Sequence, residues 1–432
     1  MQSRAQSIKR RSAVGHDRSS GVGELKLDAN NVLIALFSIM PLVDSMNGFL
    51  LRGGFSAILS VGDLYRIGVI LVMLTYYCHG IRRSYILALV SVAAYGFISI
   101  LFHAVAIRPG EANVLSEINL LVQLLLSPLL IFSLLMAVSN GTVKRKVFSI
   151  ILDNLQWVAP LTILVPYVMG LGYSTYSAAE GDLVGYKAFY YATNGISFML
   201  IALFARAVYG FLSARSMRGL IVVLINGAAL ALIGTKSTLA MLVIAFLIAI
   251  YCIYGNKIIK MLTAVIILGA VGATIWHFAS DSILSFLSPI LGRWDYFSTS
   301  VYQGDIVAAL TSGRVNQVAT HWKELSTNHS GLSILVGLGD MSDTIRICEM
   351  DFFDVFFQFG LIGLLALLLF LCFVMNRARE FSGRRGFGTC MLVFFVAYAF
   401  VVGHVFNNAL SSMVFSLFTV VAITRNDTEI SK

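Results

Sequence analysis

The chain has 432 residues, of which 58% are hydrophobic and 12% are charged, and its mean hydropathy is +0.84. A soluble domain has about 25% charged residues, so this composition excludes a water-soluble enzyme, a disordered chain and a disulfide scaffold. The net charge of +9 arises from 31 basic and 22 acidic residues, and their distribution along the chain decides its meaning. The composition predicts an all-α polytopic membrane protein.

Taken in chain order, the sequence begins with a polar segment, 1–30, which predicts a cytoplasmic tail without a cleavable signal peptide. Twelve apolar runs then predict membrane spans at 31–51, 62–80, 85–107, 118–138, 148–170, 194–212, 219–234, 238–255, 260–277, 352–375, 387–403 and 409–424. Spans 1–9 thus occupy 31–277 and spans 10–12 occupy 351–424, followed by a second tail at 425–432. Two connections, 171–193 and 278–350, are long enough to carry function, and the second is the larger.

The basic residues predict the orientation of these spans. Of the 31, 22 fall in the two tails and in alternate connections, and nine fall on the other side. The positive-inside rule therefore places both termini in the cytoplasm and both long connections outside. The net charge is explained by topology and does not indicate nucleic-acid binding.

Residues 311–325 of the large loop predict an amphipathic helix that starts at Gly313 after Ser312 as N-cap. Its predicted apolar sector contains Val315, Val318, Trp322 and Leu325, and its polar sector contains Arg314, Gln317, His321 and Glu324. A cation in the first turn opposes the helix dipole, and an anion bound at Arg314 would remove that penalty. Contact with lipid headgroups is the alternative for Arg314, and a solvated helix face is the ordinary interpretation of His321 and Glu324.

A second cation lies in the short turn between the spans at 219–234 and 238–255, where Lys236 stands among Gly234, Thr235, Ser237 and Thr238. Backbone N–H groups together with an ammonium group suit a diphosphate. The alternative is a lysine whose side chain reaches up to the membrane interface.

Three carboxylates, Glu349, Asp351 and Asp354, enter the head of the span at 352–375. An unpaired charge in the bilayer costs about 2.5–3.5 kcal/mol, so Asp354, the deepest of the three, needs a partner. Glu349 and Asp351 suit either a helix cap at the surface or a general base at the rim of a cavity. The sequence leaves open which carboxylate acts.

The other residues of interest are aromatic side chains in the loops, one charged pair and one polar turn. Trp294 beside Arg293, Trp322, and Tyr186 of the smaller loop suit stacking against sugars, although an interfacial aromatic belt is the alternative. Asp63 and Arg66, three residues apart, are predicted to pair. His404, Asn407 and Asn408 form a polar turn between the last spans that suits the lining of a cavity, although hydrogen bonds within the structure are the ordinary interpretation of such groups. No histidine, cysteine or carboxylate spacing predicts a metal site.

In layout, the chain resembles the O-antigen polymerase and ligase superfamily of bacterial envelope enzymes. The likeness in motif covers residues 230–375: the Gly-Thr-Lys-Ser turn, Ser312-Gly313-Arg314 leading to Trp322, and Gly337-Leu338-Gly339 followed by Glu349-Met350-Asp351. An apolar span containing Gly360-Leu361-Ile362-Gly363 completes it. Lys236 stands where the family usually has arginine, and Arg293 with Gly304 is similar to a spaced Arg/Gly motif of some polymerases.

The resemblance implies a GT-C-like fold and a metal-independent glycosyltransferase without cofactors, in the bacterial inner membrane with its active site on the periplasmic side. As a polymerase it would move an O-antigen or exopolysaccharide chain from polyprenyl diphosphate to a sugar hydroxyl of another lipid-linked repeat unit. Lys236, Arg314 and Arg293 would bind the diphosphate, Glu349 or Asp351 would act as base with His321 in reserve, and Trp294, Trp322 and Tyr186 would hold sugars. Candidate partners are lipid-linked oligosaccharides, membrane lipids, a chain-length regulator and a flippase.

Two other functions remain open on the sequence. A ligase would transfer the same glycan to lipid A–core. A transporter or flippase would place ionisable groups near the middle of the membrane, whereas most acids here lie at the predicted outer edge.

Overall fold

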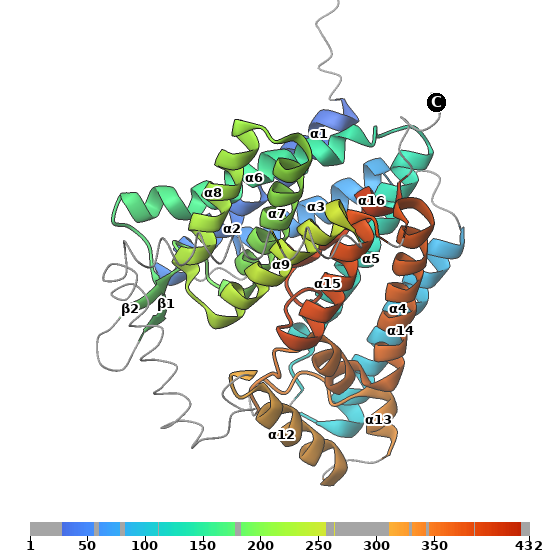
Figure 1. The fold of residues 1–432 in the computed structure, drawn as a ribbon. Coiled ribbons are helices and arrows are strands. Elements are labelled where there is room, and N and C mark those ends of the chain that lie inside the picture. The colour runs from blue at the N-terminus through green and yellow to red at the C-terminus, as the bar shows by residue number, and fades with distance from the viewer. Residues whose placement is uncertain are drawn as a thin grey trace, which may run out of the picture.

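The computed structural model describes residues 28–55, 60–77, 83–110, 112–177, 183–255, 263, 311–327, 331–342, 345–383 and 385–424. Over these residues the chain is almost entirely helical, with one two-stranded hairpin. Figure 1 shows a bundle that carries α12 (Arg314–Thr327) and α13 (Leu332–Val336) at one end and the start of α1 at the other. We call the end with α12 and α13 the loop end.

The first part of the chain supplies six of the helical segments of this bundle. They are α1 (Ala29–Ser38), α2 (Met40–Arg52), α3 (Val61–Val72) with its π-helical continuation η1 (Met73–Tyr77), α4 (Arg83–Phe102) with η2 (His103–Ile107), α5 (Val114–Ser139) and α6 (Lys146–Val168). Ser60 and Asp63 form a capping box that starts α3, and Pro41 stands in the first turn of α2, where its missing N–H costs no hydrogen bond.

The connection after α6 contains the hairpin, which the sequence does not predict. Strands β1 (Ser174–Ser177) and β2 (Leu183–Tyr186) are antiparallel, with Ser174 opposite Tyr186. Thr175 donates a hydrogen bond to the carbonyl of Ile233 at 2.8 Å, and a Cβ at Gly185 would lie 2.4 Å from the same oxygen. The hairpin therefore packs on the end of α8 (Met217–Ile233). In the chain, α8 follows α7 (Thr193–Ala214) and precedes α9 (Lys236–Tyr254).

The last three helices are α14 (Asp351–Ser382), α15 (Phe387–Val401) and α16 (Ala409–Ile423). Gly360 interrupts α14 with φ 66° and ψ −169°, and a Cβ there would lie 2.2 Å from the carbonyl oxygen of Leu335. Only glycine allows this close approach together with a positive φ. The head of α14, residues 351–359, is thereby turned away from the long remainder and lies against α13.

The interior of the bundle is formed chiefly by α16 and α7, whose side chains are buried along most of their length. Phe198, Phe395 and Phe415 pack there without exposed surface. The side-chain amide of Asn226 donates to the carbonyl of Gln156 at 2.9 Å and ties α8 to α6. Such interhelical hydrogen bonds add to packing where lipid replaces water around the helices.

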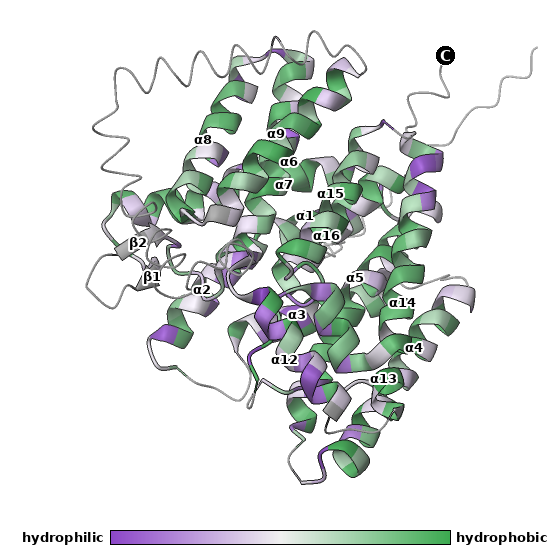
Figure 2. Cartoon of the chain, turned by 60° about the horizontal axis from the view of Figure 1, so that its bottom comes forward, coloured by the Kyte–Doolittle hydropathy of each residue, from purple (hydrophilic) through white to green (hydrophobic). Residues whose placement is uncertain are grey.

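Seven helical segments of the described chain are long and apolar enough to cross a membrane: Ala29–Arg52, Arg83–Ile107, Val114–Ser139, Lys146–Val168, Thr193–Ala214, Ser237–Tyr254 and Asp351–Ser382. The apolar helices α8, α15 and α16 are shorter. Figure 2 shows hydrophobic residues along these helices and hydrophilic residues gathered on α12. An all-α protein with multi-pass membrane character is thus confirmed, whereas the number of twelve spans and the GT-C-like arrangement stay predictions. The range 260–277 lies outside the described residues apart from residue 263.

The packing of α9 against α15 can be tested with native cysteines. Cys252, near the end of α9, and Cys390, in the first turn of α15, form a hydrogen bond with each other. We expect copper-phenanthroline treatment of membranes to link the two thiols. A protease site inserted between α12 and α13 would then leave two fragments joined until a reductant is added. Cys252→Ser and Cys390→Ser should each release the fragments, with Cys372→Ser as the matched control, and separate fragments from the wild-type chain would contradict this packing.

Candidate functional site

A polar cluster forms at the loop end where the head of α14 meets the turn between α15 and α16. Its foundation is Asp351, which is completely buried. One carboxylate oxygen accepts a hydrogen bond from the backbone N–H of His404 at 2.8 Å. The other accepts from Val405 and Phe406 at 2.7 and 3.1 Å. A carboxylate that accepts three backbone N–H groups stabilises the turn strongly, because each bond involves a charged group. Asp351 is therefore a positioning residue.

Glu349, two residues before Asp351, accepts hydrogen bonds from two arginines. Its Oε1 accepts from Arg346 at 2.6 Å and its Oε2 accepts from Arg314 at 3.2 Å. The backbone of Glu349 has φ 58°, a left-handed conformation that is rare for a residue with a side chain. A Cβ at Gly403 would lie 2.2 Å from the Glu349 carbonyl oxygen, so the two segments touch. Strain of this kind persists where the surrounding structure imposes it, often at functional sites.

Asp354, a carboxylate inside a predicted span, is paired with backbone groups. Its two oxygens accept from the N–H groups of Cys348 and Met350 at 2.9 and 3.0 Å. These bonds close the segment before α14 into a fixed loop. The two deep carboxylates, Asp351 and Asp354, thus stabilise the backbone. Glu349 lies at the surface of the cluster, where its side chain is 22% exposed.

Two histidines lie beside the arginines. The Nε2 atom of His404 is 4.0 Å from Glu349 Oε2, and no described residue forms a hydrogen bond with this nitrogen. Burial lowers the pKa of His404 to about 4, against the opposing effect of Glu349 and with further lowering by Arg314 and Arg346. The ring is therefore neutral at pH 7, and a neutral imidazole can accept a proton.

His321 is neutral for the same reason, since burial lowers its pKa. Its Nε2 bonds to the carbonyl of Arg346 at 3.1 Å, so this nitrogen carries the proton and Nδ1 holds the lone pair. The Nδ1 atom is buried without a hydrogen bond among the described residues, and the ring stacks on Phe357 at 5.0 Å.

Two cations meet at Glu349, on the exposed side of the cluster, while Asp351 and Asp354 are engaged by backbone N–H groups. Arg314 and Arg346 face the single carboxylate of Glu349, and both histidines are uncharged. Burial alone would raise the pKa of Glu349, but the hydrogen bond from Arg346 and the charges of Arg346 and Arg314 hold it below its usual value. The Nε of Arg314 is buried without a hydrogen bond among the described residues. Guanidinium groups with donors in reserve suit a phosphate or diphosphate ligand.

A second buried network holds the Gly337–Asp340 segment in place. His103 Nδ1 and Glu117 Oε2 lie 2.7 Å apart, and both side chains are buried. A Cβ at Gly339 would lie 2.3 Å from Glu117 Oε1, so only glycine passes here. Ser116 donates to the carboxylate of Asp340 from the same helix. The glycine-rich segment is thereby fastened to η2 and α5, and it carries the chain from α13 toward Glu349.

Of the predicted site residues, the structure brings four together: Arg314 and Glu349 in direct contact, His321 through the Arg346 carbonyl, and Asp351 through His404. Tyr186 lies apart on β2, where its hydroxyl donates to the Leu171 carbonyl and its ring packs edge-on against Tyr167.

Lys236 is the first residue of α9, after Thr235 as N-cap, and its side chain lies outside the described set. Arg293 and Trp294 also lie outside the described residues.

The helix at 314–327 differs from its prediction in two respects. It begins at Arg314, and the Gly313 carbonyl accepts its first helical hydrogen bond, so Gly313 is the N-cap and Ser312, with φ 56°, precedes it. Its apolar sector is only partly covered, because Trp322 is 54% exposed and stacks on Phe356, whereas the predicted polar residue His321 is buried. The head of α14 supplies partners for the polar sector, which explains why that sector turns inward.

The sequence pattern gives no signal for Arg346, His103 or Glu117, and for His404 it indicates a polar turn without a part in catalysis. The one local signal was the polar turn at His404, and the partners of that turn are more than 50 residues away in the chain. Comparison with known protein families gives no matching family model, and comparison with curated proteins gives no match either.

Acidification should destabilise this cluster. Because the pKa of His404 is about 4 in the fold and near 6.5 in the unfolded chain, the unfolded chain binds more protons between these values. Stability is then fully present above pH 6.5 and falls as the pH is lowered toward 4. We expect the thermal unfolding midpoint in detergent to drop between pH 7 and pH 5, and to drop less in His404→Gln. Equal drops in the two proteins would contradict a buried neutral His404.

Proposed function

We propose that the protein is a polysaccharide polymerase that transfers a glycan from polyprenyl diphosphate to a sugar hydroxyl of another lipid-linked repeat unit, at the outer face of the bacterial inner membrane. The observation that carries this proposal is the Glu349 carboxylate bridging Arg314 and Arg346 beside the Nε2 of His404, which forms no hydrogen bond with a described residue. Anion-binding cations next to a neutral proton acceptor are what such a transfer requires.

The arginines would hold the diphosphate of the donor. In the structure Glu349 occupies both guanidinium groups, as a bound anion would. A diphosphate carries more negative charge than one carboxylate and accepts bidentate bonds, so it would displace Glu349 from at least one arginine. Lys236 would add a third cation from the start of α9, a role that rests on its place in the sequence.

The chemistry is a displacement at the anomeric carbon. The acceptor hydroxyl oxygen forms the new bond to this carbon, and the bond from the carbon to the diphosphate oxygen breaks with its electron pair. Arg314 and Arg346 stabilise the charge that develops on the leaving diphosphate. His404 accepts the hydroxyl proton, and Glu349 at 4.0 Å stabilises the imidazolium that results.

This assignment changes the role of two predicted bases. Both oxygens of Asp351 accept hydrogen bonds from backbone N–H groups, so Asp351 positions His404 and does not take the proton. Both oxygens of Glu349 already accept hydrogen bonds from arginines, whereas the Nε2 of His404 has no hydrogen-bond partner among the described residues. His321 stays the second candidate, since its Nδ1 lone pair is free of described partners.

The diphosphate assignment predicts a glycan phenotype. Arg314→Ala and Lys236→Ala should each abolish long glycans in cells while the protein remains in the membrane. Arg377→Ala is the matched control, because Arg377 pairs with exposed Glu380 and lies over the Phe373 ring near the far end of α14. Gel analysis of surface glycans provides the measurement. Single repeat units attached to lipid A–core indicate a lost polymerase, whereas their complete absence from the core would favour the ligase. Normal chain-length ladders in both variants would contradict diphosphate binding.

The proton-transfer assignment predicts a rate effect in a reconstituted assay with lipid-linked repeat units. His404→Gln should lower kcat by about 10²-fold or more, the usual range for a lost general base, with a small change in KM. His321→Gln is the matched control and should cost much less. A larger loss in His321→Gln than in His404→Gln would transfer the role to His321.

A further inference from the structure

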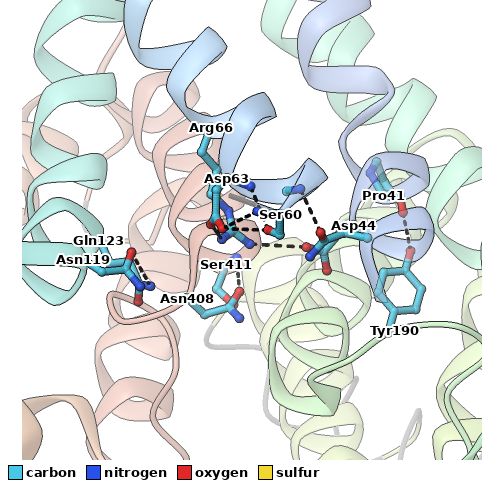
Figure 3. A network of polar contacts seen from close by, with 12 residues as sticks. Pro41, Asp44, Ser60, Asp63, Arg66, Asn119, Gln123, Tyr190, Asn408 and Ser411 are labelled. Atoms are coloured by element: carbon cyan, nitrogen blue, oxygen red, sulfur yellow. Dashed lines mark hydrogen bonds and ion pairs between the residues drawn. The ribbon is translucent and has the colours of Figure 1, made fainter. Parts of the chain in front are cut away.

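A polar cavity of about 360 Å³ lies between α2, the start of α3 and the start of α16. Figure 3 shows the side chains of Asp44, Asp63 and Arg66 turned toward one another here, with Asn408 nearby. The diphosphate chemistry described above uses none of these groups. We propose that this cavity binds an uncharged sugar unit of the acceptor glycan, an inference that rests on the proposed function.

The charge of the cavity excludes a phosphate. Arg66 Nη1 lies 3.1 Å from Asp63 Oδ1, and Arg66 Nη2 lies 3.5 Å from Asp44 Oδ1. Two carboxylates thus face one guanidinium, and the local charge is negative. A diphosphate would be repelled, while sugar hydroxyls can donate hydrogen bonds to both carboxylates.

The two carboxylates differ in what they leave open. Asp63 is engaged by Ser60, whose backbone N–H and hydroxyl both donate to its Oδ2. Asp44 has Arg66 as its only partner among the described residues, and no hydrogen bond reaches its second oxygen. An acid within a predicted span that is only half paired is costly unless it serves a ligand.

Amide groups complete the lining. Asn47 is 7% exposed, and its Oδ1 accepts from Gly62 at 2.9 Å, which leaves its NH₂ group for the cavity. The side chain of Asn407 also lines the cavity and forms no hydrogen bond with a described residue. Tyr191, at 61% exposure, also lines the cavity, and the Arg52 guanidinium lies over its ring at 5.9 Å from the centroid. Carboxylates, amides and one exposed aromatic ring match the hydroxyl groups and the apolar face of a sugar.

The position of the cavity fits an acceptor. The turn that contributes Asn407 to the cavity also contributes His404 to the cationic cluster. Three residues of chain span at most about 11 Å, so the Cα atoms of Asn407 and His404 lie within that distance of each other. A sugar held in the cavity would therefore lie near the turn that carries His404.

Binding measurements on the purified full-length protein test this arrangement. The probes are the phosphate-free oligosaccharide released from the lipid-linked repeat units of the host cells, and inorganic pyrophosphate. Asp44→Asn and Asn407→Ala should each weaken oligosaccharide binding about tenfold or more, the effect expected for a lost hydrogen bond to a charged or buried group. Both should bind pyrophosphate as the wild type does. Arg314→Ala should show the reverse pattern.

Asp153→Asn is the matched control, since it removes an exposed carboxylate that pairs with Arg206 far along the chain from the cavity. Thermal unfolding of each variant verifies its fold, and the two cavity variants act on different elements, α2 and the 402–408 turn. Unchanged oligosaccharide affinity in both cavity variants would overturn the sugar assignment and leave the proposed function intact. Unchanged pyrophosphate affinity in Arg314→Ala would contradict the proposed function instead.

Discussion

The polar end of this protein depends on one buried carboxylate. Asp351 binds three consecutive backbone N–H groups of the turn between α15 and α16, and so fixes that turn against the head of α14. Without it, Glu349 and His404 would have no reason to meet, since they belong to segments separated by more than 50 residues. Glu349 and His404, one in each of the two segments that meet here, both have positive φ. Backbone strain at these two residues is the cost of bringing a carboxylate, two arginines and an imidazole to one point.

Two polar sites that differ in their exposed charges share this turn. At one site Arg314 and Arg346 contact Glu349, and at the other Asp44 and Asp63 contact Arg66. A transfer from a diphosphate to a sugar hydroxyl needs this division, because the leaving group is an anion and the acceptor is not. In the proposed reaction, this separation would keep a diphosphate out of the cavity beside Asp44. The proposed polymerase function rests on this distribution of charge around one turn.

Much of the fold could be predicted from sequence because apolar runs report helices directly. Eleven of the twelve predicted ranges coincide with described helices, and the i,i+3 pair of Asp63 and Arg66 forms as expected. Contacts between distant segments were beyond prediction: Arg346, His404 and the half-paired Asp44 acquire meaning only from neighbours supplied by other elements. The face of α12 was misjudged for the same reason, since an amphipathic pattern does not tell whether lipid or a polar partner such as Glu349 covers the helix.

We propose that Arg314 and Arg346 bind a diphosphate that displaces Glu349 from at least one of them. A cryo-EM structure of the protein in nanodiscs with a non-hydrolysable phosphonate analogue of a polyprenyl-diphosphate-linked sugar tests it most directly. We predict phosphonate density in contact with both guanidinium groups, with Glu349 moved off at least one of them. Density for the analogue elsewhere, with Glu349 still bridging Arg314 and Arg346 as it does at 3.2 and 2.6 Å in the ligand-free protein, would contradict the account.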